Sequence, residues 1–293
     1  MMSGIEMFGS EFLGTAVMMA IACMVSASRS LPKSAAFRSD WINAALGWGL
    51  AVYVGVYVGW RTGGHLNPSI TLARVVNHWF NPGATLNGMP MGKGGIPVTA
   101  ANVGIFILAQ FLGAFVGCCI GYLATRKHFD LHTDPDVKLT VFCTKPGIRS
   151  NFWNVVSEIV GTAVLVTWVF VNGGTPTQVG PLGVALVITV LVLALGGISG
   201  AALNPARDFL RPGGVCAPAH GRQAGRGLGV CLGSLCRPLH RCSDWCGSSR
   251  HLRIGLLTLR PCRVPGDYPE RGAGRSFREQ AMPRKVWPSG ASV

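Results

Sequence analysis

Charged side chains are scarce in this sequence, and their scarcity excludes most classes of soluble protein. Only 13% of the 293 residues are Asp, Glu, Lys or Arg, whereas an average soluble domain has about 25%. Mean hydropathy is correspondingly high, at +0.38. The sequence also lacks a Cys-x₂-Cys pair and any acid–base or nucleophile constellation, so we expect no enzyme, no metal site and no cofactor.

The positive charge is unevenly distributed along the chain. Residues 1–210 hold 12 basic and 8 acidic side chains, whereas residues 211–293 hold 14 and 4. That tail has 13 Arg against one Lys, six of the ten cysteines, and no apolar run long enough to cross a bilayer. The excess of charge therefore belongs to the tail, and we expect no specific nucleic-acid partner.

Long apolar runs dominate the remainder of the chain. A membrane-spanning helix needs about 20 mostly apolar residues, and five segments qualify: roughly 8–28, 42–60, 99–125, 153–172 and 180–198. Four of the five are rich in Gly and Ala, which allow helices to approach closely in lipid. The sequence therefore predicts an all-α integral membrane protein, with the plasma membrane as the expected location.

A short turn occurs twice between these runs. Gly64-His65-Leu66-Asn67-Pro68-Ser69 corresponds to Ala201-Ala202-Leu203-Asn204-Pro205-Ala206, 137 residues later. Upstream, the segments 11–17 and 158–164 are identical at five of seven positions. The segments after the turns, 66–78 and 203–210, are too short to span. The duplication predicts an inverted-repeat helical bundle with two re-entrant half-helices.

The turn residues suit the start of a half-helix. Asn67 and Asn204 are suited to capping the helix N-terminus with the side-chain oxygen, and the prolines after them are favoured at the first helical position. The amide NH₂ is then left to donate a hydrogen bond, and the helix N-terminus carries partial positive charge. Two such ends meeting in the membrane would bind a solute oxygen and repel cations.

The sequence resembles the major intrinsic protein family of water and glycerol channels. The resemblance covers residues 8–210 and rests on five motifs: Glu11-Phe12-Leu13-Gly14-Thr15, Gly64-His65-Leu66-Asn67-Pro68-Ser69, Ala109-Gln110-Phe111-Leu112-Gly113-Ala114, Glu158-Ile159-Val160-Gly161-Thr162 and Asn204-Pro205-Ala206-Arg207-Asp208-Phe209. It implies six tilted helices and two half-helices, and a homotetramer in lipid with a pore in each protomer. It also implies passive transport of small neutral solutes such as glycerol and water.

The resemblance also assigns the selectivity filter. Arg207 would form the constriction, and Asp208 stands where the glycerol-conducting branch has Asp and water-specific members have Ser. Trp48 resembles the aromatic set against the carbon backbone of glycerol, although a Trp at the membrane interface is an open alternative. Val192 takes the place of the His of water-selective pores, which favours a wider filter.

Other matched residues would support or shape the pore. His65 is expected to tether its loop, and Glu11 and Glu158 to accept hydrogen bonds from loop backbone; a carboxylate at a helix end is the alternative. Ser69 replaces the usual Ala of the first motif. Ala201 stands where many glycerol channels have Phe or Tyr, so larger polyols or urea are also candidate solutes.

After Phe209 the sequence departs from the family, since nothing in residues 211–293 resembles a sixth spanning helix. One hypothesis is a change of reading frame near residue 210. A rival is a zinc or nucleic-acid module, although the spacings lack the usual pairing, built from Cys231, Cys236, His240, Cys242, Cys246 and His251. The loss of a span leaves an alternative function, a truncated channel remnant that does not conduct.

Overall fold

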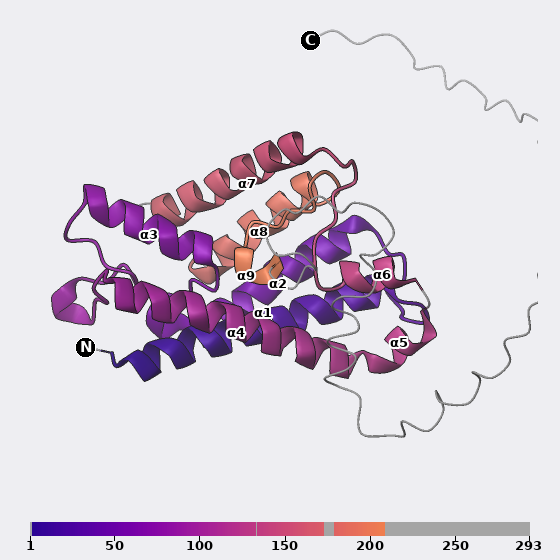
Figure 1. Cartoon of the computed structure of the whole chain (residues 1–293), viewed down its shortest axis with the longest axis horizontal. Coiled ribbons are helices and arrows are strands. Elements are labelled where there is room, and N and C mark those ends of the chain that lie inside the picture. Colours follow the sequence, from indigo (N-terminus) through magenta and orange to yellow (C-terminus); the bar gives the residue numbers. More distant parts are fainter. Residues whose placement is uncertain (1, 133, 173–178, 209–293) are drawn as a thin grey trace, which may run out of the picture. The chain divides into compact units, whose positions relative to one another are not determined.

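The computed structural model describes residues 2–132, 134–172 and 179–208 (Figure 1). Within these ranges the regular structure is helical, which confirms the predicted all-α class. The α-helices are α1 (Gly4–Ser30), α2 (Trp41–Val58), α3 (Pro68–Phe80), α4 (Ala100–Ala124), α5 (Arg126–Leu131), α6 (Pro135–Thr140), α7 (Asn151–Val171), α8 (Pro181–Leu195) and α9 (Pro205–Asp208). Two 3₁₀ turns, η1 (Trp60–Thr62) and η2 (Met91–Lys93), lie in the connections. The expectations for the tail 211–293 lie outside the described residues.

Four of the five predicted spans are long and apolar enough to cross a membrane: α1, α2, α4 and α7. The fifth, predicted over 180–198, is shorter, because α8 has 15 residues. At 1.5 Å per residue this length is roughly 22 Å, less than the roughly 30 Å of a hydrocarbon core. Pro181 occupies its first turn, and Gly196 and Gly197 follow its last residue, so both ends carry helix-terminating residues.

The helices of the structure differ from the apolar runs at two places. The first helix begins at Gly4 rather than near residue 8, because Ser3 and Glu6 form a capping box around its first turn. The connection between the third and fourth predicted spans contains the short helices α5 and α6. Polar capping residues thus extend the first helix beyond its apolar segment.

Glycines bring α1 and α4 into backbone contact. A Cβ atom on Gly113 would lie 2.5 Å from the carbonyl oxygen of Phe12, and one on Gly117 would collide with the carbonyl of Ala16. One turn later, a Cβ on Gly121 would lie 2.6 Å from the Cβ of Cys23. Any larger residue would separate the helices, so this glycine stripe sets their distance.

The helices α2 and α8 pack in the same manner across the other side of the bundle. A Cβ on Gly49 would collide with Ala185 and Thr189. Near the end of α8, the indole Nε1 of Trp41 donates to the carbonyl oxygen of Val192 at 2.9 Å. These contacts between α2 and α8 hold the face of α8 that carries Val192 against α2, next to the site described below.

Candidate functional site

The two repeated turns meet through their asparagines. The Nδ2 of Asn67 donates to the carbonyl oxygen of Leu203 at 2.9 Å, and the Nδ2 of Asn204 donates to that of Leu66 at 2.8 Å. Each Oδ1 caps its own half-helix, accepting from Ser69 N at 2.9 Å and from Ala206 N at 3.0 Å. The N-termini of α3 and α9 therefore point toward one another, and each amide has a second N–H to offer a solute.

The backbone of the two turns is strained at equivalent positions. Leu66 and Leu203 have φ of 53° and 51°, and Gly64 and Ala201 have φ of 58° and 52°. Left-handed backbone costs a non-glycine residue about 1–3 kcal/mol and persists only when its surroundings impose it. Side-chain contacts must therefore hold both turns in place.

A carboxylate braces each turn, fully buried in the first half and half-buried in the second. Glu11 accepts from His65 N at 3.0 Å and Leu66 N at 2.9 Å. In the second half Glu158 accepts from Ala202 N and Leu203 N, both at 3.0 Å. Hydrogen bonds to a charged acceptor contribute about 1.5–3 kcal/mol each, which is enough to offset the strain of the turns. These contacts account for both acids lying within apolar helices.

His65 ties the first turn to its surroundings. Its Nδ1 lies 3.0 Å from Thr71 Oγ1, and its Nε2 lies 2.9 Å from the carbonyl oxygen of Leu86. The ring also packs 5.1 Å from that of Phe106, centroid to centroid. Both nitrogens are thus engaged by the protein, which suits a tether rather than a reactive group.

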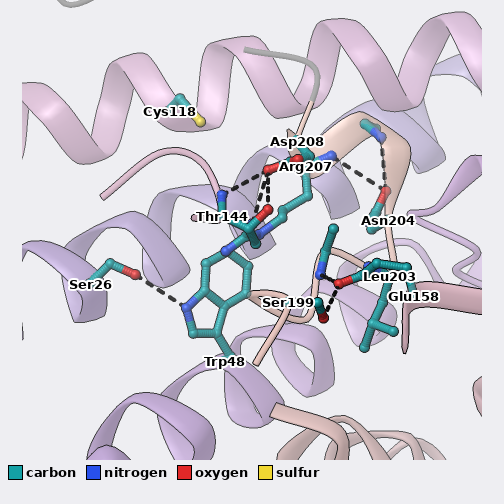
Figure 2. Close-up of polar contacts among 12 residues, drawn as sticks. Ser26, Trp48, Cys118, Thr144, Glu158, Ser199, Leu203, Asn204, Arg207 and Asp208 are labelled. Atoms are coloured by element: carbon teal, nitrogen blue, oxygen red, sulfur yellow. Dashed lines mark hydrogen bonds and ion pairs between the residues drawn. The ribbon is translucent and has the colours of Figure 1, made fainter. Parts of the chain in front are cut away.

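Figure 2 shows Arg207 lying over the face of Trp48. The guanidinium carbon is 4.4 Å from the ring centroid, and Nη1 is 3.2 Å from Asp208 Oδ1. That oxygen also accepts from Thr144, from its N at 2.8 Å and its Oγ1 at 2.9 Å. The indole Nε1 of Trp48 donates to Ser26 Oγ at 3.1 Å. Arg207, which is 8% exposed, is therefore positioned from two sides.

A cavity of about 120 Å³ runs past these residues. A water needs about 10–15 Å³ of such volume, so the cavity accommodates several waters or one small polyol. Its apolar walls repeat every fourth residue of three helices: Trp48, Val52 and Val56 of α2, Leu165 and Val169 of α7, and Val184, Ile188 and Val192 of α8. The polar lining comes from the two turns and from arginine side chains.

The predicted site residues divide into two groups. Seven line the cavity: Trp48, His65, Asn67, Val192, Ala201, Asn204 and Arg207. The other seven lie behind it, in the first turns of α3 and α9 or in the bracing contacts: Glu11, Pro68, Ser69, Glu158, Pro205, Ala206 and Asp208. The first group faces the cavity, whereas the second packs behind it.

Sequence reasoning missed the aliphatic walls and one charged residue, Arg74. The i, i+4 spacing of Val52 with Val56, and of Val184 with Ile188, places each pair on one helix face and is visible in the sequence. The spacing does not say which face of a wholly apolar helix lines a cavity. Thr144 and Asp208 are 64 positions apart, and no pattern in the sequence indicates that they are in contact.

These features define a membrane protein with a cavity at the junction of two half-helices, lined by aliphatic side chains and by polar groups of the two turns. A family model described as Major intrinsic protein matches residues 2–212. The Probable glycerol uptake facilitator protein of Thermotoga maritima is 39% identical over 203 residues, which cover 68% of this chain and 79% of that protein. The Glycerol uptake facilitator protein of Bacillus subtilis is 37% identical over 205 residues, covering 69% and 68%.

The fold has a solved counterpart as well. The X-ray structure of the aquaglyceroporin from Plasmodium falciparum matches with a TM-score of 0.54 and 25% identity, over 70% of this chain and 78% of that one. The chain therefore belongs to the major intrinsic protein family, as an aquaglyceroporin-like member.

Proposed function

We propose that this protein is a passive channel for glycerol, water and other small uncharged solutes. The observation that carries the proposal is the mixed lining of the cavity, which combines aliphatic side chains with the asparagine and arginine donors. A polyol likewise combines a carbon backbone with hydroxyl groups. The similarity to glycerol uptake facilitator proteins supports the same solute.

Solutes would move in single file and exchange hydrogen bonds with the lining. The free N–H groups of Asn67 and Asn204 and the guanidinium of Arg207 donate to solute oxygens, replacing the waters shed at entry. The walls formed by Val52, Ile188 and their neighbours offer no partner, so the hydroxyl groups turn toward the donors. Transport of this kind needs neither covalent chemistry nor a cofactor, so we propose no enzymatic activity.

Cations would be excluded by charge. The N-termini of α3 and α9 each direct partial positive charge toward the point where the two turns meet. Arg207 adds a full positive charge, which Asp208 offsets in part. Among the described residues that line the cavity there is no carboxylate. A neutral solute incurs no Coulombic cost along this path, whereas a cation meets repulsion.

The width of the filter bears on the choice of solute. Ala201 and Val192 present small side chains to the cavity, which leaves room for polyols larger than glycerol and for urea. Trp48 adds an apolar ring to the same lining, with one face covered by the Arg207 guanidinium. We propose glycerol and water as the principal solutes, with residence in the plasma membrane as a homotetramer.

One observation favours the rival function, a remnant that does not conduct. In the most apolar stretch of α7, 11% of the residues are buried, compared with 50% in that of α1. A pore wall supported this weakly would not hold the cavity closed to lipid. The two functions make opposite predictions for flux.

The test is stopped-flow light scattering of proteoliposomes containing the full chain under a glycerol gradient. Glycerol flux above that of protein-free vesicles would support the channel, whereas no flux from correctly inserted protein would support the remnant. Val192→Trp should abolish flux, because Val192 lines the cavity and is 7% exposed. Ile5→Trp is the matched control, since Ile5 is 86% exposed and its variant should conduct normally.

A further inference from the structure

A second arginine, Arg74, lines the same cavity. It follows Asn67 by seven residues on α3, so it lies roughly 10 Å along the half-helix axis from the point where the two turns meet. Its guanidinium contacts Phe170 near the end of α7 and approaches Gly88, in the connection that leads to α4. Arg74 thus belongs to elements different from those around Arg207.

The two arginines lie toward opposite ends of the cavity. Arg207 packs on Trp48, which bonds to Ser26 near the C-terminal end of α1. The connection that carries Gly88 packs instead on the N-terminal end of α1, where Leu86 clusters with Met7. A solute that passes Arg207 at one end therefore meets Arg74 at the other.

The charge of Arg74 is not compensated within the described part of the chain. Arg207 is held by Asp208 at 3.2 Å, whereas Arg74 has no hydrogen bond or ion pair among those residues, and its Nε is buried without a partner. The Phe170 ring lies 4.9 Å beneath the guanidinium carbon and supports its flat face. The edge of the guanidinium keeps its N–H donors available.

We propose that Arg74 is a second specificity-determining residue, which binds the hydroxyl oxygens of a polyol at the end of the cavity opposite Arg207. This inference rests on the proposed function. A guanidinium presents parallel N–H donors in a rigid fork, and two neighbouring hydroxyl groups of a polyol fill that fork better than one water. The residue therefore favours polyols over water and adds a second barrier to cations.

The flux test compares Arg74→Leu, Arg74→Lys and the wild-type chain in proteoliposomes. Arg74→Leu should lower the ratio of glycerol to water permeability roughly tenfold, about the effect of losing one charge-assisted hydrogen bond. Arg74→Lys keeps the charge but loses the fork, so its ratio should fall between the two. Arg61→Leu is the matched control, because Arg61 is paired with Glu6 and half exposed, and it should leave the ratio unchanged.

A merely structural role would reduce glycerol and water permeability together and leave their ratio unchanged. A ratio for Arg74→Leu within about twofold of the wild type, well below the tenfold expected for one lost bond, would therefore overturn the proposal.

A second measurement detects binding without flux. The full chain in detergent is modified with 2,3-butanedione, with and without glycerol, and each arginine is followed by peptide mass spectrometry. Glycerol should protect Arg74 and not Arg61, whereas sucrose at equal osmolality should protect neither. Protection of Arg74 in a chain that carries no flux would refute the proposed function and retain the binding site. Equal modification of Arg74 with and without glycerol would refute the binding site whatever the flux.

Discussion

The two halves of this protein build the same turn but support it differently. In each half a glutamate accepts two loop N–H groups and one hydroxyl, which comes from Thr62 in the first half and Ser199 in the second, both at 2.6 Å. Glu11 accepts a further bond from Gln110 of α4, at 2.8 Å. Among the described residues, Glu158 has no such partner.

The burial of the bracing helices differs in the same direction. Glu11 is fully buried, because α4 packs closely on α1 at Gly113 and Gly117. Glu158 is only half-buried on α7, whose buried side chains are few. The comparison teaches that one helix and its turn suffice to form the brace. In the first half, α4 also shields the carboxylate from solvent and adds a fourth hydrogen bond, from Gln110.

The largest expected effect separates the two braces. Glu11→Gln places an amide against donors that need an acceptor, in a fully buried site, and should destabilise the protein by about 3 kcal/mol. Glu158→Gln should cost about half as much, because its site is partly exposed and lacks the α4 bond. Thermal unfolding in detergent, followed by circular dichroism, measures both.

Glu6→Gln provides the control for this pair. Glu6 is exposed at the start of α1 and caps that helix with Ser3, so its substitution should move the unfolding midpoint least of the three. Equal losses for Glu11→Gln and Glu158→Gln would show that α4 contributes nothing to the first brace.

The next effect tests the contact between the two turns, in which Asn67 and Asn204 each donate a hydrogen bond to the opposite turn. Asn67→Ala and Asn204→Ala each remove one helix cap and one bond between the turns, so each should cost about 2 kcal/mol. The double variant should cost less than the sum, because the turns separate once either bond is lost. The unfolding midpoints and glycerol flux of the three variants check this. Strictly additive losses of stability would argue against a direct contact between the two turns.

A smaller difference is expected between the glycines beneath the two turns. A Cβ on Gly14 would lie 2.8 Å from the backbone oxygen of Gly55, which has no room to move. A Cβ on Gly161 would meet only the ends of the Leu195 and Leu203 side chains, which rotate. Gly14→Ala should therefore cost about 1–3 kcal/mol and Gly161→Ala less than half of that.

Unfolding midpoints of the two alanine variants decide the point. A larger loss for Gly161→Ala would mean that the second half is the more rigidly packed of the two, contrary to the burial of α1 and α7.

The smallest effect concerns the support of Trp48. Ser26→Ala removes the bond to the indole Nε1 but leaves the ring stacked under Arg207. The expected cost is about 1 kcal/mol or less, and glycerol flux in proteoliposomes should remain within about twofold of the wild type. A loss of flux as complete as that of Val192→Trp would contradict this and make Ser26 essential to the filter.

The sequence alone determined the parts of this protein that depend on neighbouring residues. The apolar runs predicted the helices, because length and hydropathy suffice to identify a span. The repeated Asn-Pro turns predicted two half-helices, since capping and proline geometry act within a few residues. The length of α8 was overestimated, because hydropathy does not register where glycines end a helix.

Tertiary structure decided what depends on contacts between distant segments. Three features arise only when the two halves come together: the choice of aliphatic faces that line the cavity, the hydrogen bonds of Thr144 to Asp208, and the packing of Arg74 on Phe170. In helices that are apolar on every side, periodicity does not distinguish the face toward lipid from the face toward the cavity. The residues of the site could thus be listed from the sequence, but their division into lining and support required the fold, because only packing decides which side chains meet the solute.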